Sequence, residues 1–254
     1  MKTLDSQTHL VQLYEADDKA LARNVSAYLV EGLNQGSGLF VVATLRHRES
    51  FLSELTNAGI DTDSISQDGR MVVLDAGETL ARLMIEGYPD AERFDAVIGA
   101  AVRDGVARSQ GRELFAYGDM VGSLWETQQF PAAIRLEQLW NRLLRAVPFR
   151  LYCSYPIDIF GSQFDAAIFD TLICAHTHLV PSGTNGELES ALRRAMQDAL
   201  GARAAQLEEA AAKYDRSSTR VPKGESTILW LRKNMPDRVD EILSRAREYY
   251  RALT

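Results

Sequence analysis

The sequence contains little cysteine, little proline and no long apolar run. Two cysteines and seven prolines occur among 254 residues, which excludes a disulfide scaffold and a proline-rich chain. No apolar run approaches the roughly 18–20 residues that cross a bilayer. The first residues also lack the apolar centre of a signal peptide. We therefore expect a cytoplasmic protein with no membrane partner, whose two cysteines are buried, reduced thiols.

Basic residues are outnumbered by acidic ones. The counts are 28 Lys and Arg against 35 Asp and Glu, which gives a formal charge of −7. A general nucleic-acid binder normally carries a basic surplus, so no direct contact with nucleic acid is expected. Hydrophobic residues make up 46% of the chain, a value typical of globular proteins. One large domain, or one domain with an appendage, fits this length.

Two catalytic signatures are missing. No Gly-x-Ser-x-Gly elbow occurs, and no Ser-His-Asp triad stands out. Residues 36–50 have the glycine, strand, loop and helix order of a phosphate-binding loop, but residues 44–50 (TLRHRES) lack both glycines and the Lys-Ser/Thr pair. Nucleotide hydrolysis is therefore not favoured. Arg46, His47 and Arg48 at a helix start could still hold an anion, and a solvated charged turn is the alternative.

Short apolar runs alternate with helical patterns over the first 180 residues. Several runs are apolar on both faces, as in parallel sheets covered by helices. The pattern predicts an α/β fold of three α/β/α layers with a mostly parallel sheet. The expected strands are 10–14, 39–44, 71–74, 113–117 and 150–155, and the expected helices are 17–33, 51–58 closed by Gly59, 77–87, 90–109, 132–147 and 164–175.

The last third of the sequence differs in composition. A turn-rich break at 181–186 precedes residues 187–214, which read as one long helix. A polar linker follows at 215–226, and Pro236 suits the start of a final helix. That helix has apolar positions on one face from Val239 to Leu253. We expect a domain over 1–181 and a C-terminal helical extension over 187–254.

Polar side chains follow the expected strands. Ligands of open α/β sheets bind beyond the carboxyl ends of the strands, so these side chains form the candidate site. Asp119 is the most distinctive, because a carboxylate directly after a strand either meets a ligand or caps the next helix, and the two roles are compatible. The candidate ligand-binding residues are Glu15, Thr44, Arg46, His47, Asp75, Tyr117, Asp119, Trp125, Glu126 and Tyr155.

Cys174, His176 and His178 alternate along the chain and are the candidate metal ligands. Three ligands suit a catalytic metal site, but alternating residues share a side only in an extended segment. The residues up to 175 read as helical, so histidines hydrogen-bonded in a loop or core are the favoured interpretation. We expect no metal, no cofactor and no catalytic residues.

A series of fragments, taken in order, resembles the MEDS domain, the sensory domain of methanogens, methylotrophs and the DcmR type of regulator. The resemblance covers about residues 9–181. The fragments are HLVQLYE at 9–15, VVAT at 41–44 with Arg46 and His47, LDA at 74–76, AYGDMV at 116–121, LWE at 124–126, IRLE at 134–137, LWN at 139–141, CSYP at 153–156 and AHTHLVP at 175–181.

This resemblance implies a RecA/KaiC-like fold with a degenerate phosphate loop. It also implies a ligand-binding role in signal transduction or transcription regulation, proposed for small hydrocarbon derivatives. One departure is Asp119, where the family often has Glu. Another is that no DNA-binding helix-turn-helix precedes residue 9 and no kinase motif follows residue 181.

The leading hypothesis is a non-enzymatic cytoplasmic sensor. A small organic ligand would bind at the carboxyl edge of the sheet and change how the C-terminal helices dock. One alternative is a nucleotide-binding protein or weak ATPase with a non-standard phosphate site. Another is a ligand-free interaction or dimerisation module. A regulatory protein partner and a homodimer both remain open.

Overall fold

The computed structural model describes residues 8–15, 19–161, 171–181, 186–212 and 220–253. The chain forms two compact units. Unit 1 comprises Met1–Val11 and Ala16–Pro156, and unit 2 comprises Gln12–Glu15 and Ile157–Thr254. The division of the chain into 1–181 and 187–254 stays a prediction.

The sheet has the strand order β3-β2-β6-β7-β1-β8. The pairs β2·β3, β2·β6 and β6·β7 are parallel, as the apolar runs predict. The five expected strands are confirmed within one residue at each end, and β8 was not predicted. The strands are β1 (His9–Tyr14), β2 (Leu39–Ala43), β3 (Met71–Asp75), β6 (Leu114–Gly118), β7 (Phe149–Pro156) and β8 (His178–Val180).

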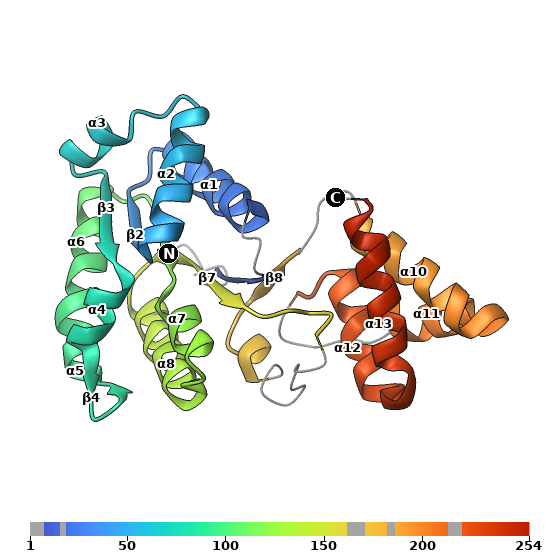
Figure 1. The fold of residues 1–254 in the computed structure, drawn as a ribbon. Coiled ribbons are helices and arrows are strands. Elements are labelled where there is room, and N and C mark those ends of the chain that lie inside the picture. Colours follow the sequence, from blue (N-terminus) through green and yellow to red (C-terminus); the bar gives the residue numbers. More distant parts are fainter. Residues whose placement is uncertain (1–7, 16–18, 162–170, 182–185, 213–219, 254) are drawn as a thin grey trace, which may run out of the picture. The chain divides into compact units, whose positions relative to one another are not determined.

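Helices cover both faces of the sheet in unit 1, which gives the expected three layers (Figure 1). Successive β6 side chains point to opposite faces. Phe115 lies against Gly32 of α1, and Leu114 lies against Gly105 of α6. One layer contains α1 (Lys19–Asn34) and α2 (Leu45–Asn57), and the other contains α4 (Ala76–Leu83), α6 (Ala100–Arg108), α7 (Met120–Glu126) and α8 (Phe130–Ala146).

Three helices of unit 1 differ from the expectation. The helix expected at 51–58 begins six residues earlier, at Leu45, and its C-cap is Ala58 rather than Gly59. The helix expected at 77–87 ends at Leu83, because a hairpin of β4 (Met84–Ile85) and β5 (Tyr88–Pro89) follows. Glu86 and Gly87 between these strands have φ of 49° and 84°, the left-handed pair of a tight hairpin turn. The helix expected at 90–109 is divided into α5 (Ala91–Phe94), a π turn (Asp95–Gly99) and α6.

Unit 2 is mainly helical and corrects two expectations. The single helix over 187–214 is wrong: α10 (Glu187–Leu200) ends at Gly201, whose φ of 57° favours glycine, and a 3-10 turn and α11 (Ala204–Ala212) follow. Residues 223–226 are not linker, because α12 (Lys223–Asn234) begins directly after Pro222.

The final helix, α13 (Pro236–Arg251), begins at the expected proline. Its apolar face is buried at Val239, Ile242, Leu243 and Ala246, whereas Leu253 is exposed. Both α10 and α12 pack against α13, so unit 2 itself covers this face. The helix expected at 164–175 lies largely outside the described residues. Within the described ranges, no helix is long and apolar enough to cross a membrane.

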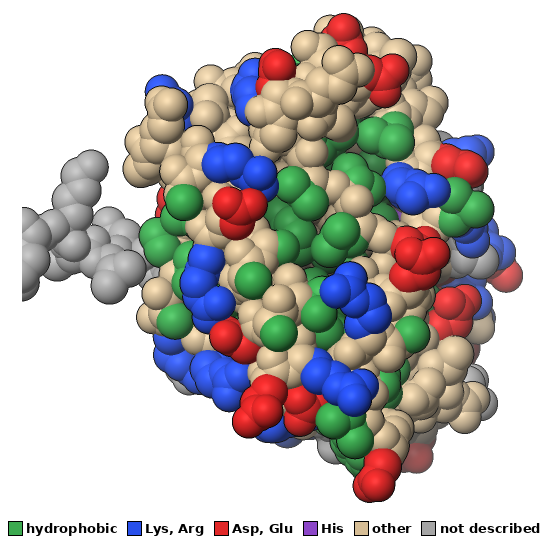
Figure 2. All heavy atoms as spheres, turned by 90° about the vertical axis from the view of Figure 1, so that its left-hand side faces the viewer, with side chains coloured by type: hydrophobic (Ala, Val, Ile, Leu, Met, Phe, Trp, Pro, Cys, Tyr) green, Lys and Arg blue, Asp and Glu red, His purple; other side chains and the backbone are tan. Residues whose placement is uncertain are grey.

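One face of unit 1, on the side of β3, α4 and α6, is shown in Figure 2. Basic and acidic side chains are interspersed there, with hydrophobic side chains between them. This face carries no patch of a single sign, which agrees with the modest net charge of −7.

Candidate functional site

Asp119 is the centre of a buried polar network at the carboxyl ends of β2 and β6. Its Oδ2 accepts from the Thr44 backbone N–H at 3.1 Å and lies 2.7 Å from Nδ1 of His47. Its Oδ1 lies 3.3 Å from the hydroxyl oxygens of both Tyr117 and Ser154. These two hydroxyls are 2.7 Å apart, so one of them donates to the other, which in turn donates to Asp119. The side chain thus links three neighbouring strand ends, and it makes no capping bond to its own helix α7.

The carboxylate of Asp119 stays ionised although only 1% of the residue is exposed. Burial pushes its pKa up, but the hydrogen bond and charge of His47, followed by the bonds from Thr44, outweigh this effect and lower the pKa below its ordinary value of 3.8. A buried anion therefore fixes the ring of His47, which is itself only 5% exposed.

The connection from β2 to α2 explains why His47 meets Asp119. Strand β2 ends at Ala43 and the helix begins at Leu45, so Thr44 alone joins them. The Thr44 hydroxyl caps the helix by accepting the His47 backbone N–H. A phosphate cradle needs several backbone N–H groups that point at the ligand. Here the N–H groups of Thr44 and His47 already have protein acceptors.

The other candidate residues are not in this network. Asp75 caps α4 by accepting from the Glu78 N–H at 2.9 Å. Tyr155 donates to Glu137 at 2.5 Å, and Trp125 packs edge-on against Tyr155. Arg46 and Glu126 are exposed. The structure therefore brings together Thr44, His47, Tyr117 and Asp119 out of the ten candidates.

Glu15 lies in unit 2, where its pKa is raised. Burial is the main cause and the negative charge of Asp158 the second, while Arg247 and Arg251 act in the opposite direction. Oε2 of Glu15 lies 3.8 Å from Nη2 of Arg251. Glu15 thus belongs to an ionic group that also contains the Arg247–Asp158 pair.

The three alternating metal candidates do not form one group of metal ligands. Cys174 is exposed, which corrects the expectation of two buried thiols, and Cys153 is buried. Nδ1 of His176 lies 2.7 Å from the Leu172 carbonyl, and Nδ1 of His178 lies 2.9 Å from the Thr177 hydroxyl. Among the described residues, no group of three metal-ligand types contains Cys174 or His178.

A cavity at the opposite, amino edge was not anticipated. Its volume is about 310 Å³, and it lies where β2, β3 and β6 begin. Arg70, Arg108 and Arg112 line it together with Ser37 and Ser109. These residues precede strands, so the rule that ligands bind beyond the carboxyl ends of strands does not predict them.

Ser154 was also missed by sequence reasoning. It lies next to Tyr155, which was a candidate, but alternation along β7 directs the two side chains to opposite faces. Ser154 joins the Asp119 network, whereas Tyr155 faces Glu137 of α8. Only the neighbour order of β6 and β7 could have identified Ser154.

Helix α7 is pressed against the end of β7 beside this network. A Cβ at Gly122 would lie 2.6 Å from the Ser154 carbonyl oxygen, a backbone atom with little freedom to shift. We expect Gly122→Ala to lower the free energy of unfolding by about 1–3 kcal/mol, the usual cost of overpacking. Urea unfolding measures the change. Ser123→Ala, on the same helix, should cost clearly less, and equal losses would contradict the close approach.

The fold and site define a parallel α/β domain with a buried, ionised carboxylate at the carboxyl edge of its sheet. The family model MEDS, described as "MEthanogen/methylotroph, DcmR Sensory domain", matches residues 8–177. The chain belongs to this family of sensory domains, as the resemblance of its fragments predicts. No curated protein matches the chain significantly.

Proposed function

We propose that the protein acts as a non-enzymatic sensor that binds a small polar organic ligand at the carboxyl ends of β2 and β6. Membership of a sensory family supports the general role. The observation that carries the site is the His47–Asp119 pair, which is buried, hydrogen-bonded and placed directly at the start of α2. A ligand that contacts this pair would favour one position of α2 over another.

A nucleotide-binding role is less well supported. The single-residue connection at Thr44 leaves no loop to surround a phosphate, and its N–H is bonded to Asp119. Arg46 is exposed at the first turn of α2 and is the feature that favours an anion. We therefore expect the protein to show no saturable response to MgATP.

Native mass spectrometry of the full chain, before and after mild denaturation, is the first test. We expect a small co-purifying mass that denaturation releases, that His47→Gln loses and that Glu49→Gln retains. Glu49 is an exposed residue of α2 and serves as the matched control. Retention of the mass by the His47 variant would contradict the proposed site.

Protein that purifies without a ligand is tested by ¹H–¹⁵N NMR with methanol and with MgATP as probes. Saturable shifts with methanol at residues 44–48 and 117–120 are expected. Shifts confined to the amino-edge cavity would move the site there, and saturable shifts with MgATP would favour the nucleotide-binding alternative.

A further inference from the structure

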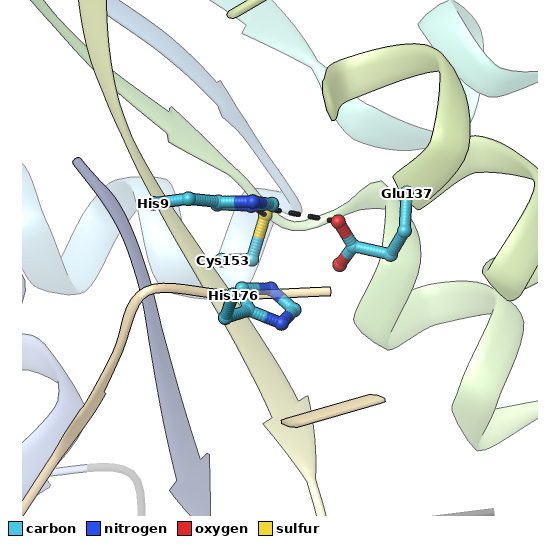
Figure 3. Close-up of side chains that lie close together, drawn as sticks. All are labelled: His9, Glu137, Cys153 and His176. Atoms are coloured by element: carbon cyan, nitrogen blue, oxygen red, sulfur yellow. Dashed lines mark hydrogen bonds and ion pairs between the residues drawn. The ribbon is translucent and has the colours of Figure 1, made fainter. Parts of the chain in front are cut away.

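A second buried polar cluster lies on the other face of β7. Cys153 points away from the Asp119 network because it neighbours Ser154 along the strand. Its Sγ lies 3.5 Å from Nε2 of His9, and that nitrogen lies 3.5 Å from Oε2 of Glu137 (Figure 3). The three residues are at most 3% exposed. The proposed ligand-binding role does not use this cluster.

We propose that His9, Glu137 and Cys153 bind a divalent transition-metal ion, and that Zn²⁺ is the ion their chemistry fits best. Imidazole nitrogen, carboxylate oxygen and thiolate sulfur are the three ligand types that zinc uses in proteins. Neutral histidine with one carboxylate and one thiolate balances the double positive charge. A neutral site of this kind is far less costly to bury than an unpaired ion.

The spacing of the three ligand atoms suits a metal. Zinc–ligand bonds of about 2.0–2.3 Å at tetrahedral angles place neighbouring ligand atoms about 3.3–3.6 Å apart. The two distances from Nε2 of His9, to Sγ and to Oε2, are both 3.5 Å. All the ligand atoms of the cluster lie within 4.8 Å of one another. Little movement is needed to place an ion between them.

Two of the three ligands are held in place by neighbours. Nδ1 of His9 lies 3.1 Å from the Asn141 side-chain oxygen, so Nδ1 carries the donated proton and Nε2 presents its lone pair to Cys153 and Glu137. The Tyr155 hydroxyl donates to the other carboxylate oxygen, Oε1 of Glu137. Outer partners of this kind orient metal ligands and raise affinity.

Metal binding converts the Cys153 thiol to a thiolate, and its proton is released to solvent. Three ligands from unit 1 do not complete a zinc coordination shell. Water, an exogenous molecule or a further side chain would supply the rest. The competing interpretation is a metal-free cluster in which His9 and Glu137 form an ion pair beside a neutral thiol.

Cobalt titration separates these interpretations. The full chain is stripped with a chelator and titrated with Co²⁺, which reports zinc sites optically. We expect one equivalent to bind with a thiolate-to-cobalt charge-transfer band that Zn²⁺ abolishes. Cys153→Ser should lose the band, and Cys174→Ser, the matched control with the exposed cysteine, should keep it. Zn²⁺ should raise the unfolding temperature of the control but not of Cys153→Ser.

Circular dichroism establishes that each variant is folded. Asn141→Leu provides a second test, because it keeps all three ligands and should weaken Co²⁺ binding about 10- to 100-fold. A band that survives Cys153→Ser, or one that disappears with Cys174→Ser, would overturn the assignment. Absence of Co²⁺ and Zn²⁺ binding by the folded, stripped wild type would also overturn it.

Discussion

Replacement of Asp119 by alanine is expected to lower the free energy of unfolding by about 3–5 kcal/mol at neutral pH. The substitution removes the acceptor of the Thr44 N–H, of the His47 ring and of the buried pair of hydroxyls formed by Tyr117 and Ser154. Each buried donor that loses its acceptor costs about 1–3 kcal/mol. Urea unfolding of the variant and the wild type measures the difference.

Asp75→Ala is the matched control, because Asp75 also follows a strand and precedes a helix. It removes only a helix cap, which costs about 1 kcal/mol. If both variants lost the same free energy of unfolding, the Asp119 network would contribute no more to stability than a helix cap does.

A different variant, Asp119→Asn, gives a pH test. Asp119 has a folded-state pKa below its ordinary value of 3.8, so its contribution is complete above pH 3.8 and is lost as pH falls through the lower folded value. The stability gap between wild type and Asp119→Asn should therefore narrow below pH 3.8. If the difference in free energy of unfolding between the two proteins stayed constant from pH 7 to pH 3, it would contradict an ionised Asp119.

Introduction of a charge at Ile242 is expected to destabilise unit 2 by several kcal/mol. Ile242 lies on the buried face of α13 and is 0% exposed. An aspartate there has no partner, and a buried unpaired carboxylate is strongly unfavourable. We expect Ile242→Asp to lose the cooperative unfolding of unit 2 and to aggregate on heating, as measured by circular dichroism and light scattering.

Ser244→Asp is the matched control, with the same charge on an exposed position of the same helix. It should unfold like the wild type. The two variants also test the ligand-free dimerisation alternative. If the face of α13 joined two copies, Ile242→Asp would stay folded and change only the oligomeric state measured by sedimentation.

The strands were predictable because buried parallel strands are continuous apolar runs with polar residues at their ends. Leu39–Ala43 and Leu114–Gly118 are buried along their whole length, so each appears in the sequence as a continuous, largely apolar run. The hairpin after Leu83 was not predictable in the same way. Its strands have two residues each, and the left-handed Glu86 gives no sequence signal of its own.

The candidate site was predictable in part for a different reason. The rule that ligands bind beyond the carboxyl ends of the strands identifies Thr44, His47 and Asp119 from their positions in the sequence alone. It does not separate Asp75 from Asp119, because β3 and β6 are both neighbours of β2 and the two carboxylates differ in their hydrogen-bond partners. His9 and Cys153 are 144 residues apart, and only the fold brings them within 3.5 Å. Single-sequence patterns carry no information on such long-range pairs.

The one-residue connection at Thr44 means that a small movement at the start of α2 is amplified at its far end. With 13 residues the helix is about 20 Å long. Because Thr44 alone joins β2 to α2, a displacement of the His47 backbone must tilt the whole helix. A tilt of about 10° at its base would displace its far end, near Gly59, by about 3 Å. A displacement of less than about 1 Å at the buried His47 would thus move the far end of α2 by about 3 Å. A partner protein that contacts this end of the helix could distinguish the two positions.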